Sequence, residues 1–417
     1  MKEIVDFLIR VNNLKEMPRT GWVLMDVKRP ETVAEHVFGV AILSWLLGEK
    51  KRLSVEKLIK TSLAHEFCEV YAGDITPVLY YPRLPKNKTK RKKVLMKWAR
   101  LLEKEKEKIG KKKFKIEKKS LFKLIEPLTI ELKKEILYFW LGYKRGLIRE
   151  GKFVRQINRI ETLLQSIAFF GTKDANIRTN WWEWTEEIVE DPLLLDFLKI
   201  VQKKFYEKKL IRLKEEKELE SILNFFWKVQ ELKSMPRRIW VLMKLKKPET
   251  VAGHLFSVAL ISWILAKKNL DREKILKMAL CHEMPSVYTG DLITPFRIRN
   301  KKGEIFQKWP RLPQAEKVKI FFEDFKKEKR AFEKLTLKLK PNLKKEMISL
   351  WEEYKRNLTP EARFVNQANV LAVLLQALQY KSKDKNLPIE WMWEWAFEKC
   401  DDPTILEFLS QIQKKFL

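Results

Sequence analysis

An all-α protein made of two tandem helical bundles is the fold class that this 417-residue sequence predicts. The length suits two or three domains, and a pattern of about 210 residues occurs twice in the chain. Apolar residues follow helical spacings, and alternating β-branched runs bounded by turns are missing. Hydrophobic residues make up 45% of the chain and glycines number only 12, so a sizeable helical core can be buried.

The internal repeat consists of four motifs that recur in the same order. KEMPRTGWVLMDVKRPETVAEHVFGVAILSWLL returns as KSMPRRIWVLMKLKKPETVAGHLFSVALISWIL, and LAHEFCEVYAGDITP returns as LCHEMPSVYTGDLITP. FVRQINRIETLLQSI and WEWTEEIVEDP return as FVNQANVLAVLLQAL and WEWAFEKCDDP. The offset drifts only from 218 to 211 residues, so the loops differ in length while the elements persist. A period this long indicates two whole domains, which we expect at residues 1–207 and 219–417.

The first strongly patterned segment of each repeat predicts a buried helix. In the first repeat this helix covers residues 33–47, with Thr32 as its N-cap. Apolar residues cover a wide face of this segment, as they do in helices that are surrounded by protein.

A second helix is predicted over residues 55–72. Its spacing places Leu58, Ser62, His65 and Glu69 on one face, and Gly73 supplies a suitable C-terminal residue. The joint between the repeats, residues 206–218, has neither glycine nor proline and also predicts helix, so we expect a stiff connection.

Charge and cysteine content limit the possible classes of protein. The formal net charge of +31 excludes an acidic solvating protein and favours anionic partners. Cys68, Cys281 and Cys400 lie far apart and form no CxxC motif, which argues against a disulfide framework or a structural zinc site. The N-terminal stretch is patterned as an amphipathic helix and no apolar run is long enough to span a membrane. We therefore expect a cytoplasmic protein without membrane contact.

The four histidines all belong to the repeat. His36 and His65 lie in the first copy, and His254 and His282 in the second. His65 is followed by Glu66, and by Glu69 one turn later, so one helix can direct several ligands to one point. With a second histidine this makes a nitrogen and oxygen donor set suited to manganese, cobalt, iron or magnesium. Buried core histidines with no metal are the alternative.

These motifs, in this order and spacing, resemble the HD-domain superfamily, and within it the 5′-deoxynucleotidase family. The resemblance covers almost all of each repeat. It implies an all-helical fold, a divalent metal ion (manganese, cobalt or magnesium), and release of phosphate from deoxyribonucleoside 5′-monophosphates.

The resemblance assigns roles to particular residues. In the first repeat it implies metal ligands (His36, His65, Glu66 and Asn158), catalytic carboxylates (Glu69, which orients or deprotonates the water, and Asp74 on the substrate side) and substrate contacts (Arg19 and Trp22). In the second repeat the matching residues are His254, His282, Glu283, Ser286, Asp291 and Asn369. Arginine suits a phosphate because of its two-pronged donor geometry, and tryptophan suits a base or sugar. Core packing is an equal alternative for Trp22.

The sequence departs from the family pattern at three positions of the site. Glu66 and Glu283 stand where the family has Asp, and Asn158 and Asn369 stand where it has a metal-binding Asp. Asparagine keeps an oxygen donor but removes a negative charge. Ser286 replaces the acidic residue that would serve as the base of the second site. We therefore expect the first repeat to be the catalyst and the second to be degenerate.

A strongly basic segment covers residues 81–120. It holds 18 Lys and Arg against 4 Asp and Glu, which gives a net charge of +14. The segment suits an electrostatic funnel for nucleotides or a contact surface for nucleic acid. The alternative is a solvated lysine-rich surface, since no RNA-binding motif accompanies it.

Two functions follow for the whole chain. One is a metal-dependent phosphomonoesterase that acts on deoxyribonucleoside 5′-monophosphates, mainly through the first repeat. The other is a catalytically impaired tandem protein that binds nucleotides or nucleic acid without turnover. We further expect the repeats to pack as a pseudo-dimer within a monomeric chain.

Overall fold

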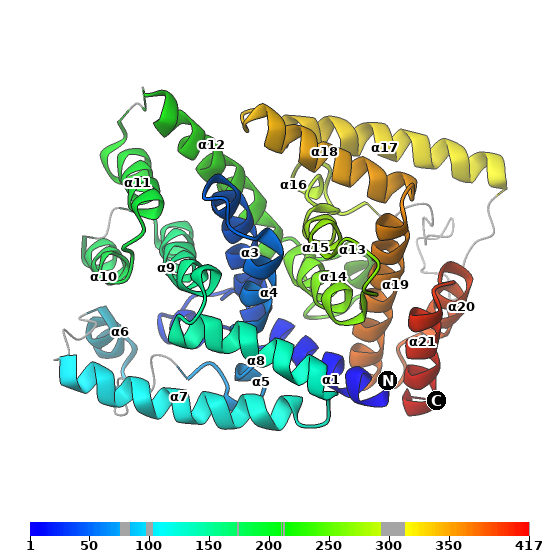
Figure 1. The fold of residues 1–417 in the computed structure, drawn as a ribbon, viewed down its shortest axis with the longest axis horizontal. Coiled ribbons are helices and arrows are strands. Elements are labelled where there is room, and N and C mark those ends of the chain that lie inside the picture. Colours follow the sequence, from blue (N-terminus) through cyan, green and yellow to red (C-terminus); the bar gives the residue numbers. More distant parts are fainter. Residues whose placement is uncertain are drawn as a thin grey trace. The chain divides into compact units, whose positions relative to one another are not determined.

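The computed structural model describes residues 1–75, 84–96, 103–172, 175–209, 211, 213–292 and 313–416. These residues form helices joined by short connections, as predicted, and contain no strand (Figure 1). Two isolated antiparallel bridges, Pro18 to Thr32 and Pro236 to Thr250, fix the same turn in each repeat. None of the described helices is both long enough and apolar enough to cross a membrane.

By its internal contacts the chain divides into two compact units. The N-terminal unit contains Asn13–Leu223, and the C-terminal unit contains Met1–Asn12 together with Asn224–Leu417. The first helix therefore contributes to the C-terminal unit, where Asn12 accepts a hydrogen bond from Ser257 and donates one to Gln379. The limits 1–207 and 219–417 follow the repeat and stay a prediction about domains.

The N-terminal unit contains most of the first repeat. Its elements are η1 (Asn13–Lys15), α2 (Thr20–Leu24), α3 (Val33–Lys50), α4 (Val55–Ala64), α5 (Glu69–Ala72), α6 (Lys88–Met96), α7 (Glu103–Ile125), α8 (Ile130–Arg145), α9 (Arg149–Phe170), α10 (Ala175–Glu186), α11 (Pro192–Val201), η2 (Gln202–Glu207) and the first part of α12 (Lys214–Val229).

The C-terminal unit repeats this order. Its elements are α1 (Lys2–Asn12), the end of α12, η3 (Gln230–Lys233), α13 (Arg238–Leu242), α14 (Val251–Leu265), α15 (Arg272–Cys281), α16 (Ser286–Thr289), α17 (Gln314–Thr336), α18 (Pro341–Arg356), α19 (Pro360–Lys381), α20 (Glu390–Lys399) and α21 (Pro403–Phe416).

One buried helix forms the centre of each unit. Helix α3 packs against α4 and α9, and α14 packs against α15 and α19 in the same way. Every residue of α3 from Val33 to Gly48 is buried. Thr32 and Glu35 form a reciprocal capping box at its start, whereas in α14 only the Thr250 hydroxyl caps the helix because Gly253 replaces the glutamate. A rigid, capped helix thus carries the first histidine of each repeat.

Two sequence predictions about helix continuity are wrong. The helix expected over residues 55–72 is divided, because the chain tightens into turns between His65 and Cys68, with hydrogen bonds from Phe67 N to Ala64 O and from Glu69 N to Glu66 O. The joint expected to be helical leaves the helix at Lys208, which adopts a left-handed conformation at φ 54°. Both breaks occur without proline, so the sequence held no breaker signal for them.

Candidate metal centre

His36 is held on α3 by a buried carboxylate of α9. Its Nδ1 donates a hydrogen bond to Oε2 of Glu161 over 2.5 Å, and both side chains are fully buried. A carboxylate can only accept, so this contact places the proton on Nδ1 and leaves Nε2 as the nitrogen able to bind a metal ion. Histidine ligands of metals are commonly oriented in this way by a partner on the other ring nitrogen.

His65 is oriented by its own helix. Its Nδ1 donates to the carbonyl oxygen of Ser62 over 2.6 Å, so its proton is also on Nδ1. The buried Nε2 has no hydrogen-bond partner among the described residues. The ring packs against Tyr143, with 4.8 Å between centroids, and lies 5.7 Å from the ring of His36. Burial lowers the pKa of His65 to about 4, which keeps it neutral and able to coordinate.

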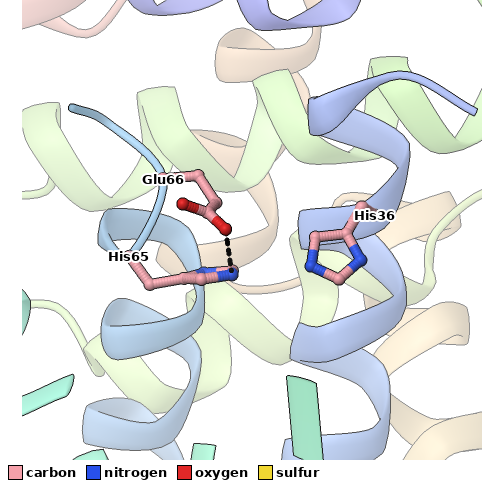
Figure 2. A group of neighbouring side chains, drawn as sticks. All are labelled: His36, His65 and Glu66. Carbon is pink, nitrogen blue, oxygen red and sulfur yellow. Dashed lines mark ion pairs between the residues drawn. The ribbon is translucent and has the colours of Figure 1, made fainter. Parts of the chain in front are cut away.

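Glu66 completes a three-ligand cluster. One donor atom each from His36, His65 and Glu66 lies within 4.8 Å of the others, and all three residues are buried. Figure 2 shows both rings and the carboxylate turned toward a shared space between α3 and the end of α4. The turn after α4 thus has a consequence: it places the glutamate beside the histidine ring, with Oε1 3.5 Å from Nε2 of His65.

Cations of the protein surround the carboxylate of Glu66. Nζ of Lys144 and Nη1 of Arg19 each lie 3.8 Å from it. Burial by itself raises the pKa of Glu66, but Lys144, His65 and Arg19 outweigh burial and leave the pKa below its ordinary value. Glu66 is therefore ionised, as a metal ligand must be. Lys144 also pairs with Glu117 at 3.0 Å.

Glu69 begins α5 and is buried beside this cluster. Its Oε2 has no hydrogen-bond partner among the described residues. Burial, together with the negative charges of Glu66 and Asp74, raises the pKa of Glu69 well above its ordinary value. A carboxyl group with such a raised pKa and a bare oxygen is typical of a proton-transfer site.

Arg19, a cation, and Asp74, an acidic residue, lie next to each other beside the cluster. Nε of Arg19 lies 3.8 Å from Oδ2 of Asp74, and the backbone N–H of Thr20 donates to the same oxygen over 2.7 Å. The Thr20 hydroxyl donates to the Asp74 carbonyl. Asp74 is thus used in fixing the start of α2, and Arg19 lies between two carboxylates.

Trp22 has the contacts of a core side chain. It is 2% exposed, its indole N–H donates to Glu31 over 2.9 Å, and its ring packs against Phe169 and Trp181. These contacts agree with the core-packing alternative. Its role as a substrate contact stays a prediction.

Asn158 lies at the tyrosine that packs on His65. Its Nδ2 donates to the Tyr143 hydroxyl over 2.7 Å, and no hydrogen bond joins it to His36 within the described part of the chain. Coordination of a metal by its amide oxygen stays a prediction.

The matching residues of the second repeat make different hydrogen bonds. Nε2 of His254 is hydrogen-bonded to Oδ1 of Asn369 at 2.8 Å, whereas in His36 the hydrogen bond to Glu161 is made by Nδ1. Asn369 in turn donates to Tyr354 over 2.9 Å. His282 repeats His65, with Nδ1 donating to the Ala279 carbonyl over 2.9 Å and a pKa lowered by burial to about 4.

The acidic residues of the second repeat are tied to an arginine. Nη1 of Arg237 lies 3.0 Å from Oδ1 of Asp291 and 3.4 Å from Oε1 of Glu283. Burial raises the pKa of Glu283, but Lys355, Arg237 and His282 outweigh it and lower the pKa to about 2. Ser286 donates to Glu283 over 3.4 Å and offers no carboxylate. The three-ligand cluster of the first repeat has no counterpart among the described residues of the second.

Sequence reasoning missed three residues that shape the site: Glu161, Lys144 and Tyr143. Glu161 was within reach, since it lies three residues after Asn158 on one helix and the second repeat has Ala372 at the matching position. The half-buried Lys144 and Tyr143 carried no comparable signal, because a lysine and a tyrosine occur at the matching positions of both repeats within an ordinary amphipathic helix.

The basic segment lies partly outside the described residues. On α7, Lys106 pairs with Glu187, and Lys111 with Glu107. Other lysines of α7, among them Lys112 and Lys115, are exposed. Binding of nucleic acid by this segment stays a prediction.

The described residues form a helical protein with a buried histidine–carboxylate cluster that could hold a metal ion. The chain belongs to the HD-domain family, whose model matches residues 11–187 and 229–394. The family resemblance is therefore confirmed in both repeats.

Curated relatives match about half of the chain, as expected when one relative aligns with one repeat. A 5′-deoxynucleotidase HDDC2 of Xenopus laevis is 29% identical over 197 residues, 47% of this chain and 88% of the relative. The human protein of that name is 27% identical over 194 residues, 46% of this chain and 85% of the relative. A solved structure from Pyrococcus horikoshii is 28% identical, covers 48% of this chain and 97% of its own, and has a TM-score of 0.34.

Proposed function

We propose that the first repeat is a metal-dependent phosphomonoesterase that releases phosphate from deoxyribonucleoside 5′-monophosphates. The observation that carries this proposal is the buried cluster of His36, His65 and Glu66. The names of the curated relatives support the substrate class.

The residues present fit a divalent cation. Among the described residues, Nε2 of His65 has no hydrogen-bond partner, and Glu66 is ionised beside it. Two imidazoles and a carboxylate suit manganese or cobalt, and carboxylate with amide oxygen suits magnesium. When bound, such an ion supplies positive charge for the phosphoryl group and acidifies a water molecule. The three ligands leave coordination positions open, as a catalytic site requires.

Glu69 is the proton acceptor of the proposal. Hydrolysis forms a bond from the water oxygen to phosphorus and breaks the bond from phosphorus to the 5′ oxygen. It requires removal of a proton from the water and delivery of a proton to the departing 5′ oxygen. The raised pKa of Glu69 makes its carboxylate a better base once it is ionised. Its position one turn after Glu66 places it beside the cluster.

Arg19 is the phosphate-binding residue of the proposal. Its guanidinium lies 3.8 Å from both Glu66 and Asp74, distances that leave its donors without close bonds to either carboxylate. A phosphate can accept these donors in two-pronged fashion. Asp74 accepts a hydrogen bond from the backbone N–H of Thr20, and so fixes the start of α2, next to Arg19.

The test is a phosphate-release assay on metal-stripped protein. Manganese, cobalt and magnesium are added singly, with deoxyribonucleoside and ribonucleoside 5′-monophosphates as substrates. We expect metal-dependent release that favours deoxyribonucleotides. Absence of release with all three ions, on folded protein, would contradict the proposal.

A second candidate function is nucleotide binding without turnover. The bond between His254 and Asn369 favours it for the second repeat, because it occupies the nitrogen that a metal requires. Saturable binding of a deoxyribonucleotide by a protein that releases no phosphate would establish it for the whole chain.

A further inference from the structure

We propose that Glu161 decides which repeat holds the metal ion. Its hydrogen bond to Nδ1 of His36 leaves Nε2 available to the metal, whereas the second repeat has Ala372 at this position and Nε2 of His254 is hydrogen-bonded to Asn369. Glu161 acts through His36 and is therefore a positioning residue. The inference deepens the proposed function and rests on it, since it assumes that the first site binds a divalent cation.

The argument begins with the two ring nitrogens of the first histidine. In the first repeat Nδ1 of His36 is bound by Glu161, so Nε2 faces His65 and Glu66. Glu161 is fully buried, and a buried carboxylate requires a donor. The pair therefore fixes both the ring orientation and the tautomer of His36.

The second repeat has no carboxylate at the position of Glu161. Ala372 lies at the position of Glu161, three residues after Asn369, and its methyl group cannot accept a hydrogen bond. There Nε2 of His254 is bonded to Asn369, whose amide is set by Tyr354. Because Oδ1 of the amide accepts, the proton of His254 is on Nε2, and a metal could bind this nitrogen only after displacing that proton.

The asparagine by itself does not explain the difference. Asn158 and Asn369 occupy matching positions, and both donate to a tyrosine hydroxyl. Only in the second repeat does the asparagine also bond the histidine. Glu161 differs between the repeats and is hydrogen-bonded to the histidine of the first.

The inference predicts the tautomer of each of the four histidines. His36, His65 and His282 carry the proton on Nδ1, where an obligate acceptor binds it, and His254 alone carries it on Nε2. A chain with only four histidines gives four ring spin systems, so histidine labelled with ¹⁵N makes this pattern measurable. Single histidine substitutions assign the signals.

The first experiment combines that spectrum, recorded at pH 8 without metal, with manganese titration by calorimetry. We expect the unmodified protein to show one Nε2–H tautomer, assigned to His254, and to bind one manganese ion. Glu161→Ala, which copies the second repeat, should weaken manganese binding roughly 10–100-fold. Glu161→Gln keeps an acceptor oxygen and should recover most of the affinity.

Several results would overturn the inference. An Nδ1–H tautomer at His254 would do so even if the Glu161 variants fail to fold, because it is measured on the unmodified protein. Equal manganese affinity of Glu161→Ala would overturn the inference and leave the proposed function intact. An unmodified protein that binds no manganese would overturn the inference, and one that binds none of manganese, cobalt and magnesium would overturn the proposed function as well.

The second experiment adds the missing carboxylate. Ala372→Glu should move the proton of His254 to Nδ1 and create a second manganese site per chain, while Ala372→Leu, similar in bulk and without an acceptor, should not. A gain with the leucine variant, or an unchanged Nε2–H tautomer in a folded glutamate variant, would contradict the proposal.

Discussion

The two repeats have the same histidine pair, His–Glu doublet, asparagine and lysine at matching positions, yet the hydrogen bonds of the first histidine differ. In the first repeat Glu161 is hydrogen-bonded to Nδ1 of His36. Donor atoms of His36, His65 and Glu66 lie within 4.8 Å of one another. In the second, His254 is bonded to Asn369 across the site. The difference teaches that ligand residues alone do not make a metal centre, because the partner on the second ring nitrogen decides what the first can bind.

Removing the first histidine of each repeat should give the largest contrast. His36→Ala deletes a ligand of the proposed centre and should abolish metal-dependent phosphate release. His254→Ala deletes a histidine that is already hydrogen-bonded within the protein and should leave turnover within about two-fold. Steady-state phosphate release measures both, and equal losses from the two variants would contradict the asymmetry.

The carboxylate after each doublet gives the next contrast. Glu69→Gln is nearly isosteric and should lower turnover by roughly 10²–10⁴-fold, the usual contribution of general acid–base assistance. The matched variant Ser286→Ala should leave turnover unchanged, because the serine hydroxyl donates to Glu283 and supplies no carboxylate. Full activity of a folded Glu69→Gln protein would remove Glu69 from the mechanism.

The half-buried lysines Lys144 and Lys355 should distinguish the two sites by their effects on stability. Lys144→Met and Lys355→Met each strip a cation from buried glutamates and should each cost roughly 3–5 kcal/mol of unfolding free energy without metal. Manganese should stabilise Lys144→Met more than the unmodified protein, because Glu66 then loses a competing cation. Lys355→Met should show only the response of the unmodified protein. Thermal denaturation with and without manganese distinguishes them, and equal responses would count against a centre confined to the first repeat.

Lowering the pH should give the smallest contrast. The folded pKa values of His65 and His282 are about 4, below the ordinary value of 6.5, because both rings are buried. The stability that this confers is full above pH 6.5 and is lost as the pH falls toward 4, by up to about 3 kcal/mol for each histidine. Urea unfolding of metal-free protein across this range measures the slope, and His282→Gln should reduce it. A slope that the variant leaves unchanged would assign the acid sensitivity to other groups.

The sequence predicts the fold well because its signals are local and occur twice. The buried helices α3 and α14 and the cap at Thr32 follow from apolar spacing and one hydroxyl. The break after His65 does not follow, because residues between it and Cys68 include no proline or glycine and the turn depends on tertiary packing.

The residues of the site can be predicted from the sequence, but their hydrogen-bond partners cannot. Motif spacing identified His36, His65 and Glu66, which the structure brings together. It could not identify the contact between His36 and Glu161, which are 125 residues apart in the chain. Nor could it show that Nε2 of His254 is hydrogen-bonded to Asn369, because both repeats have a histidine and an asparagine at these positions.

The number of manganese ions bound per chain tests the central claim most directly. Metal-stripped protein is titrated in parallel with its His36→Ala and His254→Ala variants, each shown to be folded by circular dichroism. One ion per chain that is lost in His36→Ala and kept in His254→Ala is the predicted result. Two ions per chain, or one ion that is lost in His254→Ala, would contradict it.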